Sequence, residues 1–197
     1  MLRDKLRGYR LILASSSPRR KLLFEGIDLD FTVETGGNIA EDFDNSIDIK
    51  KVPEYLAELK SKGFPRKLEN NEILITADTM VLCNNEILGK PKERDDAIKI
   101  LTKLSGNKHQ VLTSVYIRSN YKSRSFTAIT DVYFRELSPE EIDYYIDNYA
   151  PYDKAGAYGA QEWIGYIAIN RIEGSYFNVM GLPIHQLYME LEKFLTN

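Results

Sequence analysis

The stretch Ser15-Ser16-Ser17-Pro18-Arg19-Arg20 places hydroxyl and cationic side chains at the predicted start of a helix. Ser17 is a favourable N-cap, and Pro18 is a favourable first helical residue. The cations that follow lie where the helix dipole already presents positive charge, at a cost of roughly 0.3–1 kcal/mol each. A bound anion would reverse this effect, because backbone N–H groups, hydroxyls and guanidinium groups would converge on it. The pattern favours a phosphate or polyphosphate site, with a solvated basic turn as the alternative.

Asp78 is the carboxylate best placed to act on a phosphate group. It follows the apolar run Ile73–Ala77, which we expect to be a buried strand that ends at Asp78. Ligands of open α/β sheets collect at the carboxyl ends of strands. An acid at such a position can hold a divalent metal ion or activate a water molecule. The alternative is an aspartate that starts a turn.

Three further side chains would suit such a site, although each also has a simple structural explanation. Lys90 lies in a Gly-Lys-Pro turn that can place an ammonium group beside an anion, or leave it solvated. Lys60 ends a predicted helix, where a lysine is favourable in any case. Glu41 lies in an acidic excursion, and Mg²⁺ often needs one or two carboxylates besides substrate phosphates. Composition alone does not choose between Glu41, Asp42 and Asp44.

Gln161 follows a glycine-rich segment, 153–160, that precedes Trp163. Its amide offers one donor and one acceptor in a plane, which matches the N3–H and O4 edge of uracil or thymine. The alternative is a glycine-rich loop packed on Trp163. His109 and His185 are far apart in sequence, so we expect both to be structural. Cys83 lies in an apolar run, so we expect a strand residue rather than a catalytic thiol.

Composition limits the possible partners and compartments. The chain has 197 residues, of which 43% are hydrophobic, and its formal net charge is −3. Such a balance does not attract nucleic acid or an anionic membrane. The single cysteine excludes an intramolecular disulfide and fits a reducing compartment. No apolar run approaches the ~18 residues that span a bilayer, and the charged first residues lack a signal-peptide core. We expect a cytoplasmic protein.

The elements that must position these residues alternate between strand and helix at both ends of the chain. We expect helices near residues 18–24, 53–60, 95–104, 138–149 and 184–194, and strands near 11–14, 73–77, 111–117, 126–134 and 164–169. A hairpin over 80–88 should turn at Asn84-Asn85, and Ser138 with Glu141 forms a capping box. This order predicts an α/β fold, with a mixed central sheet and flanking helices, as a single domain over residues 1–197.

Seven short motifs follow one another along nearly the whole chain: Leu13-Ala14-Ser15-Ser16-Ser17-Pro18-Arg19-Arg20, Ala77-Asp78-Thr79, Gly89-Lys90-Pro91, Leu104-Ser105-Gly106 with His109-Gln110-Val111, Asp153-Lys154-Ala155-Gly156-Ala157-Tyr158, Glu173-Gly174-Ser175-Tyr176 and Gly181-Leu182-Pro183. In this order they resemble the Maf family of nucleoside triphosphate pyrophosphatases. The resemblance implies a fold shared with the inosine-triphosphate pyrophosphatases, with two lobes around a cleft, and, often, a homodimer. It implies hydrolysis of a nucleoside triphosphate to monophosphate and pyrophosphate, with a divalent metal ion, Mg²⁺ or Mn²⁺.

The resemblance also assigns roles to individual residues. The catalytic aspartate of the family falls on Asp78, which with Glu41 would bind the metal ion. Phosphate-binding roles fall on four side chains: Ser15, Arg19, Lys60 and Lys90. In the subfamily that acts on dTTP and UTP, specificity depends on three positions, occupied here by Arg19, Thr79 and Gln161. The resemblance gives no role to Arg20, and we interpret it as a residue that only supports the turn.

One departure from the family pattern lies next to Glu41. The family usually has a second acid at the preceding position, where this chain has Ala40, and Gly36-Gly37-Asn38 looks like an insertion. The resemblance leaves the physiological substrate open between normal and modified pyrimidine nucleotides. The alternative function is a nucleotide-binding regulator of cell division or septum formation with little catalysis. The intact acid and lysine set disfavours that alternative, and the acidic balance disfavours a nucleic-acid-binding module.

Overall fold

The computed structural model describes residues 1–35, 39–44 and 46–196, and the chain forms two compact units. The first unit comprises Met1–Asp78, Thr113–Ala128 and Gly181–Asn197, and the second comprises Thr79–Leu112 and Ile129–Met180. Three long strands contribute residues to both units: β3 (Glu72–Cys83), β5 (Lys108–Arg118) and β6 (Ser123–Phe134). The segment Gly36-Gly37-Asn38 lies outside the described residues, so its interpretation as an insertion stays a prediction.

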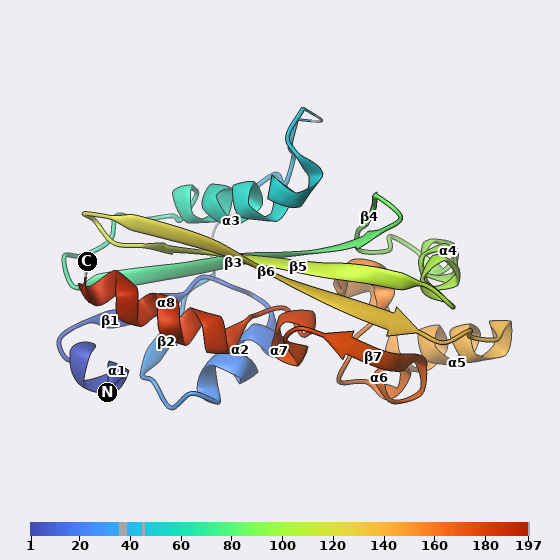
Figure 1. The fold of residues 1–197 in the computed structure, drawn as a ribbon. Coiled ribbons are helices and arrows are strands. Elements are labelled where there is room, and N and C mark those ends of the chain that lie inside the picture. The colour runs from blue at the N-terminus through green and yellow to red at the C-terminus, as the bar shows by residue number, and fades with distance from the viewer. Residues whose placement is uncertain (36–38, 45, 197) are drawn as a thin grey trace. The chain divides into compact units, whose positions relative to one another are not determined.

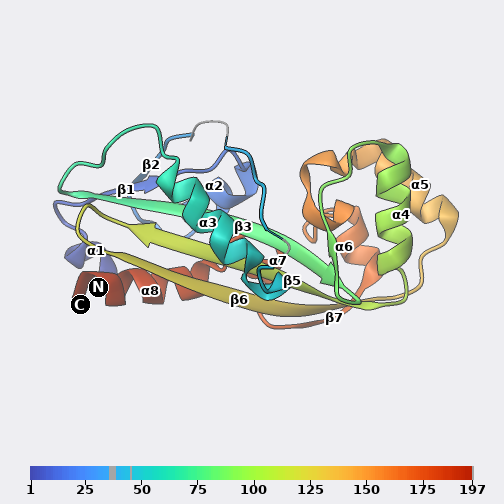
Figure 2. The ribbon, with the colours of Figure 1, turned by 90° about the horizontal axis from the view of Figure 1, so that it is seen from above.

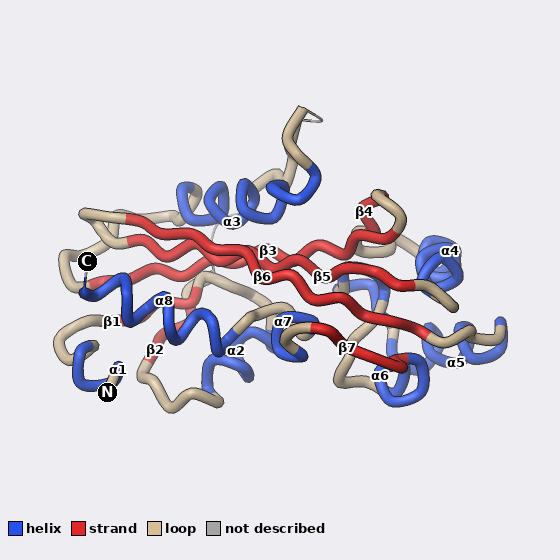
Figure 3. The backbone as a smooth tube through the Cα atoms, in the orientation of Figure 1, coloured by secondary structure: helices blue, strands red, loops and turns tan. Residues whose placement is uncertain are grey.

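In the described part of the chain the strands form a mixed sheet, in the order β2-β1-β3-β5-β6-β7 with β4 on β3 (Figure 3). β1 (Arg10–Leu13) runs parallel to β2 (Phe31–Val33) and to β3. β4 (Glu86–Leu88) runs antiparallel to β3, and β7 (Ile169–Glu173) runs antiparallel to β6. Parallel and antiparallel pairs with helices between them confirm the predicted mixed α/β fold.

Helices cover both faces of the strands in the first unit (Figure 1). α3 (Val52–Lys62) lies on one face, and the Thr76 hydroxyl donates a hydrogen bond to its Ala57 carbonyl at 2.7 Å. The other face carries α2 (Pro18–Glu25) and α8 (Ile184–Thr196), and α1 (Leu2–Lys5) packs on α8. A short 3-10 helix, η1 (Ile49–Lys51), precedes α3. The predicted helices over 18–24, 53–60 and 184–194 are thereby confirmed.

β3 is longer than predicted, so the expectation that Asp78 ends its strand is wrong. The strand continues because its residues stay largely buried beyond Asp78, and because the Asn84-Asn85 turn returns it as a hairpin. Both asparagines adopt positive φ, as a tight two-residue hairpin turn requires. β1 pairs with β3 as far as Ile75, and β4 pairs with it from Val81. Asp78 therefore lies in the stretch of β3 between these two partners.

The predicted strand over 164–169 is also wrong, since α6 (Trp163–Ala168) is a helix and β7 begins at Ile169. This apolar run suits either structure, so its composition could not decide. Ile164 and Ala168 are buried four residues apart, whereas Tyr166 is exposed, which is helical spacing. A Cβ on Gly165 would lie 1.9 Å from the Ala160 carbonyl oxygen, so a glycine is needed for α6 to pack so closely.

The helices of the second unit pack around a core that includes Tyr145 and Cys83. α4 (Arg94–Leu104) contacts α5 (Pro139–Tyr149), and both lie near α6 (Figure 2). The predicted capping box begins α5: Ser138 N–H donates to Glu141 Oε2 at 2.9 Å, and Glu141 N–H donates to Ser138 Oγ at 3.3 Å. Shorter elements complete the unit: η2 (Pro151–Asp153), η3 (Ala155–Ala157) and α7 (Tyr176–Val179).

Two side chains of the second unit show the structural surroundings that their sequence context predicted. Cys83 ends β3 and is 3% exposed, and its burial raises the pKa of the thiol. His109 is buried edge-on against Phe134 and Tyr158, and its Nε2 lies 2.8 Å from the Tyr158 hydroxyl. Burial lowers the pKa of His109 to about 4, so its ring is neutral near pH 7.

Within the described residues, each helix is too short or too polar to cross a bilayer.

Candidate active site

The basic turn after β1 folds as predicted, with a serine-capped helix whose first turn carries cations. Ser17 caps α2, because its Oγ accepts a hydrogen bond from the Arg20 N–H at 3.5 Å. The Ser15 hydroxyl accepts a hydrogen bond from the Ser17 N–H at 3.2 Å. The first turn of α2 contains no acidic side chain. Cationic side chains thus combine with the positive end of the helix dipole, an arrangement that favours a bound anion.

Arg20 is partly buried and links α2 to two other segments of the first unit. Its Nη1 donates to the Ala77 carbonyl at 2.9 Å, and its Nε donates to the Gly181 carbonyl at 2.8 Å. Burial lowers the pKa of Arg20, and the nearby charge of Asp78 opposes this effect. Arg20 therefore supports the turn, as predicted, and it does so beside Asp78. The substrate role of Arg19 stays a prediction.

Three predicted site residues meet at the ammonium group of Lys60. Lys60 Nζ lies 2.6 Å from Oδ1 of Asp78 and 2.9 Å from Oε1 of Glu41. Lys60 comes from the last turn of α3, Asp78 from β3, and Glu41 from the loop before η1. The side chains are 10%, 22% and 47% exposed for Asp78, Lys60 and Glu41 respectively. These three side chains therefore extend from the buried sheet to solvent. Composition alone did not choose between Glu41, Asp42 and Asp44, and the contact with Lys60 favours Glu41.

Asp78 and Glu41 have the oxygen-ligand chemistry that a hard divalent cation prefers. Asp78 and Glu41 supply carboxylate oxygens on either side of one cationic group. Among the residues that the structure describes, no three His, Cys, Asp or Glu side chains gather as a metal cage. Two carboxylates match a Mg²⁺-type ion that takes its remaining oxygens from water and substrate phosphates.

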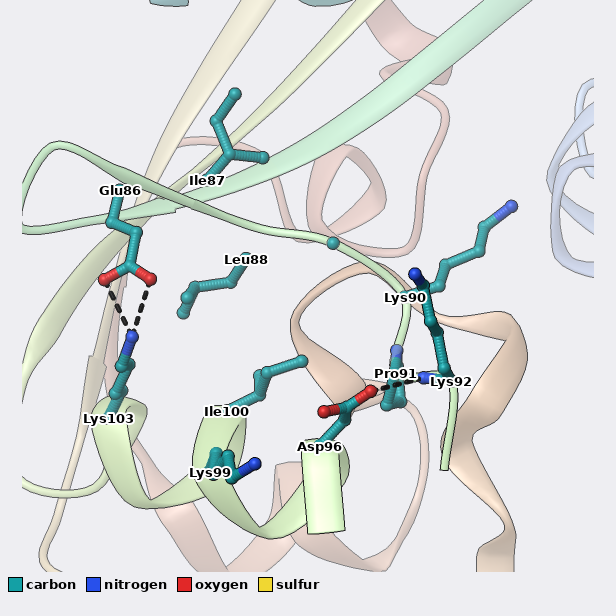
Figure 4. Close-up of a pocket in the computed structure, with 11 residues that line it drawn as sticks. Glu86, Ile87, Leu88, Lys90, Pro91, Lys92, Asp96, Lys99, Ile100 and Lys103 are labelled. Atoms are coloured by element: carbon teal, nitrogen blue, oxygen red, sulfur yellow. Dashed lines mark hydrogen bonds and ion pairs between the residues drawn. The ribbon is translucent and has the colours of Figure 1, made fainter. Parts of the chain in front are cut away.

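The other predicted site residues, Thr79, Lys90 and Gln161, belong to the second unit. Thr79 follows Asp78 in β3. Lys90 follows β4 and lines an open cavity of about 240 Å³ together with Lys92, Leu88 and Ile100 (Figure 4). The Lys90 side chain extends away from the Glu86–Lys103 ion pair on the far side of that cavity (Figure 4).

The turn that carries Lys90 packs on the segment that leads to Gln161. The Gly156 N–H donates to the Gly89 carbonyl at 3.1 Å. Gly156 has a φ of +73°, and a Cβ there would lie 2.9 Å from a methyl group of Val81. Only a glycine combines this backbone conformation with this close approach. The paired glycines thus place the Lys90 turn beside η3.

The side-chain amide oxygen of Gln161 is a buried hydrogen-bond acceptor that the described residues leave unsatisfied. Its Oε1 is buried and has no hydrogen-bond partner within the described residues. A buried acceptor without a donor costs roughly 1–3 kcal/mol, so an incoming N–H group would find a prepared partner here.

Sequence reasoning missed the side chains that brace the Gln161 segment. Tyr145 lies within the helix predicted near residues 138–149, but neither Tyr145 nor Glu162 carried a predicted role in the site. The Tyr145 hydroxyl bonds to Glu162 Oε2, and Lys154 Nζ lies 3.1 Å from Glu162 Oε1. The Asp-Lys-Ala-Gly motif was a signal for Lys154, but no sequence spacing links it to Tyr145.

Known proteins match this chain along most of its length. The family model described as Maf-like protein matches residues 10–194. A dTTP/UTP pyrophosphatase of Porphyromonas gingivalis is 50% identical over 193 residues, which cover 97% of both chains. Proteins with the same name are 49% identical in Flavobacterium psychrophilum, over 97% of both chains, and 48% identical in Phocaeicola vulgatus, over 96% of this chain and 98% of that one.

A solved structure shows the same fold at low sequence identity. The HAM1 protein of Coxiella burnetii aligns with a TM-score of 0.51 and 12% identity, over 94% of this chain and 99% of its own. At this identity the likeness concerns the fold alone. The family match and the close relatives carry the assignment further, and by them this chain belongs to the Maf family.

Proposed function

We propose that this chain is a metal-dependent pyrophosphatase that hydrolyses dTTP and UTP to the nucleoside monophosphate and pyrophosphate. The observation that carries the proposal is Lys60 between Asp78 and Glu41, beside Arg20 and a helix N-terminus rich in cations. Such a set combines carboxylates for a metal ion with cations for phosphates. The name shared by relatives at 48–50% identity supports the substrate class.

In the proposed reaction, water attacks the α-phosphorus, the bond from phosphorus to the α–β bridging oxygen breaks, and pyrophosphate leaves. Asp78 orients this water and takes its proton. Lys60, Lys90 and Arg19 bind phosphate oxygens, and the Ser15–Ser17 turn offers backbone N–H groups. Asp78 and Glu41 would hold a Mg²⁺ or Mn²⁺ ion, which when bound neutralises charge on the phosphate oxygens.

Gln161 is proposed to select the base. Its Oε1 would accept the N3–H of uracil or thymine, and its Nε2 would donate to O4. Cytosine presents the reverse order of donor and acceptor, so CTP should react at least about tenfold more slowly at low concentration. Arg19 and Thr79 are proposed to complete the specificity set.

We also propose a cytoplasmic location and a homodimer. The single cysteine, Cys83, fits a reducing compartment. Analytical ultracentrifugation of the full chain tests the dimer, and a sedimentation coefficient that stays monomeric at high concentration would exclude it.

A nucleotide panel tests the proposed activity. Purified protein is incubated with dTTP, UTP, CTP, dATP or GTP and with Mg²⁺, Mn²⁺ or EDTA, and released pyrophosphate is measured. We expect turnover of dTTP and UTP that requires the metal ion, with the label from ¹⁸O-water in the monophosphate. Nucleotide binding without pyrophosphate release would favour the regulator instead. Equal rates on dTTP and CTP would remove the role given to Gln161.

A further inference from the structure

The segment that carries Gln161 is held from both sides by one hydroxyl group. The Tyr145 hydroxyl donates to Glu162 Oε2 and accepts a hydrogen bond from the Gly159 N–H at 3.0 Å. Gly159 and Glu162 are themselves joined, because the Glu162 N–H donates to the Gly159 carbonyl at 3.0 Å. The turn Gly159–Glu162, with Gln161 inside it, is therefore clamped onto α5.

Burial makes this clamp rigid. Tyr145 is fully buried, and burial, with the adjacent Glu162 carboxylate, raises the pKa of its hydroxyl, which stays protonated as a donor. The other oxygen of Glu162 faces Lys154 Nζ at 3.1 Å, and the Lys154 side chain is 8% exposed. A carboxylate that is held on both oxygens, as in the partly buried Glu162, has little freedom to rotate. Through Glu162, the position of α5 therefore fixes the backbone next to Gln161.

The Gln161 amide nitrogen also packs closely on Gly159. A Cβ on Gly159 would lie 2.9 Å from Gln161 Nε2 and 2.8 Å from Glu162 Cδ. The amide nitrogen is thus packed against the backbone of the same turn that Tyr145 holds. The buried Oε1 keeps its unmet acceptor.

Rigidity matters here because a glutamine amide can read two opposite patterns. Rotation of the amide by 180° exchanges its donor and acceptor, and the exchanged order matches cytosine instead of uracil. A freely rotating Gln161 would therefore accept both bases. Discrimination requires that something hold the amide in one orientation.

We propose that Tyr145, acting through Glu162 and Gly159, is a positioning residue that fixes the Gln161 amide and so sets the preference for uracil and thymine over cytosine. This inference rests on the proposed function and deepens it. Tyr145 touches neither substrate nor reacting atoms in this scheme. Its loss affects which base binds and leaves the phosphate chemistry intact.

The main test is Tyr145→Phe, which removes the hydroxyl and keeps the ring. The ratio of kcat/KM for dTTP over CTP should fall about tenfold, mainly through a higher KM for dTTP and a lower KM for CTP. The kcat for dTTP should stay within about twofold. Tyr149→Phe is the matched control, because Tyr149 lies one turn further along α5 with its ring stacked on Tyr145 and is 37% exposed. This control should keep the wild-type ratio.

Gly159→Ala provides a second route to the same result. The added methyl group would displace the Gln161 amide directly, so the selectivity ratio should again fall. If Tyr145→Phe does not fold, as judged by thermal unfolding, Glu162→Ala decides the matter, because it removes the carboxylate that the Tyr145 hydroxyl holds. A wild-type ratio in either folded variant would overturn the inference, as would an equal loss of kcat on both nucleotides. A wild-type enzyme that does not distinguish dTTP from CTP would overturn the proposed base recognition itself, and this inference with it.

Discussion

Two buried carboxylates of β3, six residues apart, meet cations in different ways. Glu72 accepts from both terminal nitrogens of Arg66, at 2.7 and 3.0 Å, and from the Glu69 N–H at 2.8 Å. Arg10 also binds it, and Arg66 reaches on to Glu34. We call these residues the Glu72 cluster. Forked guanidinium groups and a backbone N–H occupy both oxygens of Glu72, a pattern typical of a structural ion pair.

The Asp78 cluster, which consists of Asp78, Lys60 and Glu41, is built differently. A lysine is the cation, and it is shared between a buried carboxylate and one that is 47% exposed. The lysine ammonium is a flexible point charge rather than a forked, planar donor. Such a group can exchange a carboxylate for a phosphate oxygen with little rearrangement. The comparison teaches that the kind of cation, a flexible ammonium group or a forked guanidinium group, separates an ion pair for binding from one for stability.

The largest expected effect comes from Asp78→Asn. Removal of the proton acceptor and metal ligand should lower the turnover of dTTP about 10³-fold, with a smaller change in nucleotide binding. Steady-state kinetics with a fluorescent-nucleotide titration separates the two. Asp131→Asn is the matched control, since Asp131 pairs with Lys108 at 2.6 Å in a strand of the second unit. Wild-type turnover by Asp78→Asn would refute the role given to Asp78.

Glu72→Gln should lower the stability of the fold and leave the turnover nearly unchanged, the opposite of Asp78→Asn. The neutral amide cannot balance Arg66 and Arg10 beside a side chain that is 0% exposed. Because both arginines are partly exposed, we expect a loss of about 2 kcal/mol in the free energy of unfolding. Urea unfolding measures this loss, and turnover per folded molecule should stay near the wild-type value. A stable but inactive Glu72→Gln would show that the two clusters do not differ in the way described.

The smallest effect is the acid response of the Glu72 cluster. A hydrogen bond from Arg66 lowers the pKa of Glu34 below its usual value of 4.5. The stabilisation is therefore complete above pH 4.5 and is lost as the pH falls through the lowered pKa of the folded state. Solvent screening limits it to about 0.5 kcal/mol. The difference in unfolding free energy between the wild type and Glu34→Gln should shrink between pH 6 and pH 3, and a constant difference would contradict this assignment.

Local sequence signals predicted the turn and the helix ends well. Ser17 and Pro18 begin α2, and Ser138 with Glu141 begins α5, because capping chemistry acts within a few residues. The hairpin at Asn84-Asn85 was likewise predictable from residues that tolerate positive φ.

Features that depend on distant neighbours were not predictable in the same way. The length of β3 depends on β4 as a partner, so Asp78 could not be placed inside the strand from its own surroundings. The helix α6 depends on the close approach of Gly165 to Ala160. The contacts of Lys60 with Asp78 and Glu41 join residues 18 and 19 positions away, and only the family resemblance linked them beforehand.

The burial of the single cysteine makes its reactivity a measure of local opening of the structure. A thiol reagent can modify Cys83 only after the end of β3 opens, because the side chain is buried and its pKa is raised. The rate of modification by a small disulfide reagent therefore counts opening events of the β3–β4 hairpin. Because the chain has no second thiol, all of the modification of the protein takes place at Cys83. A nucleotide that lowers the rate of Cys83 modification would thereby show that it binds, without any measurement of turnover.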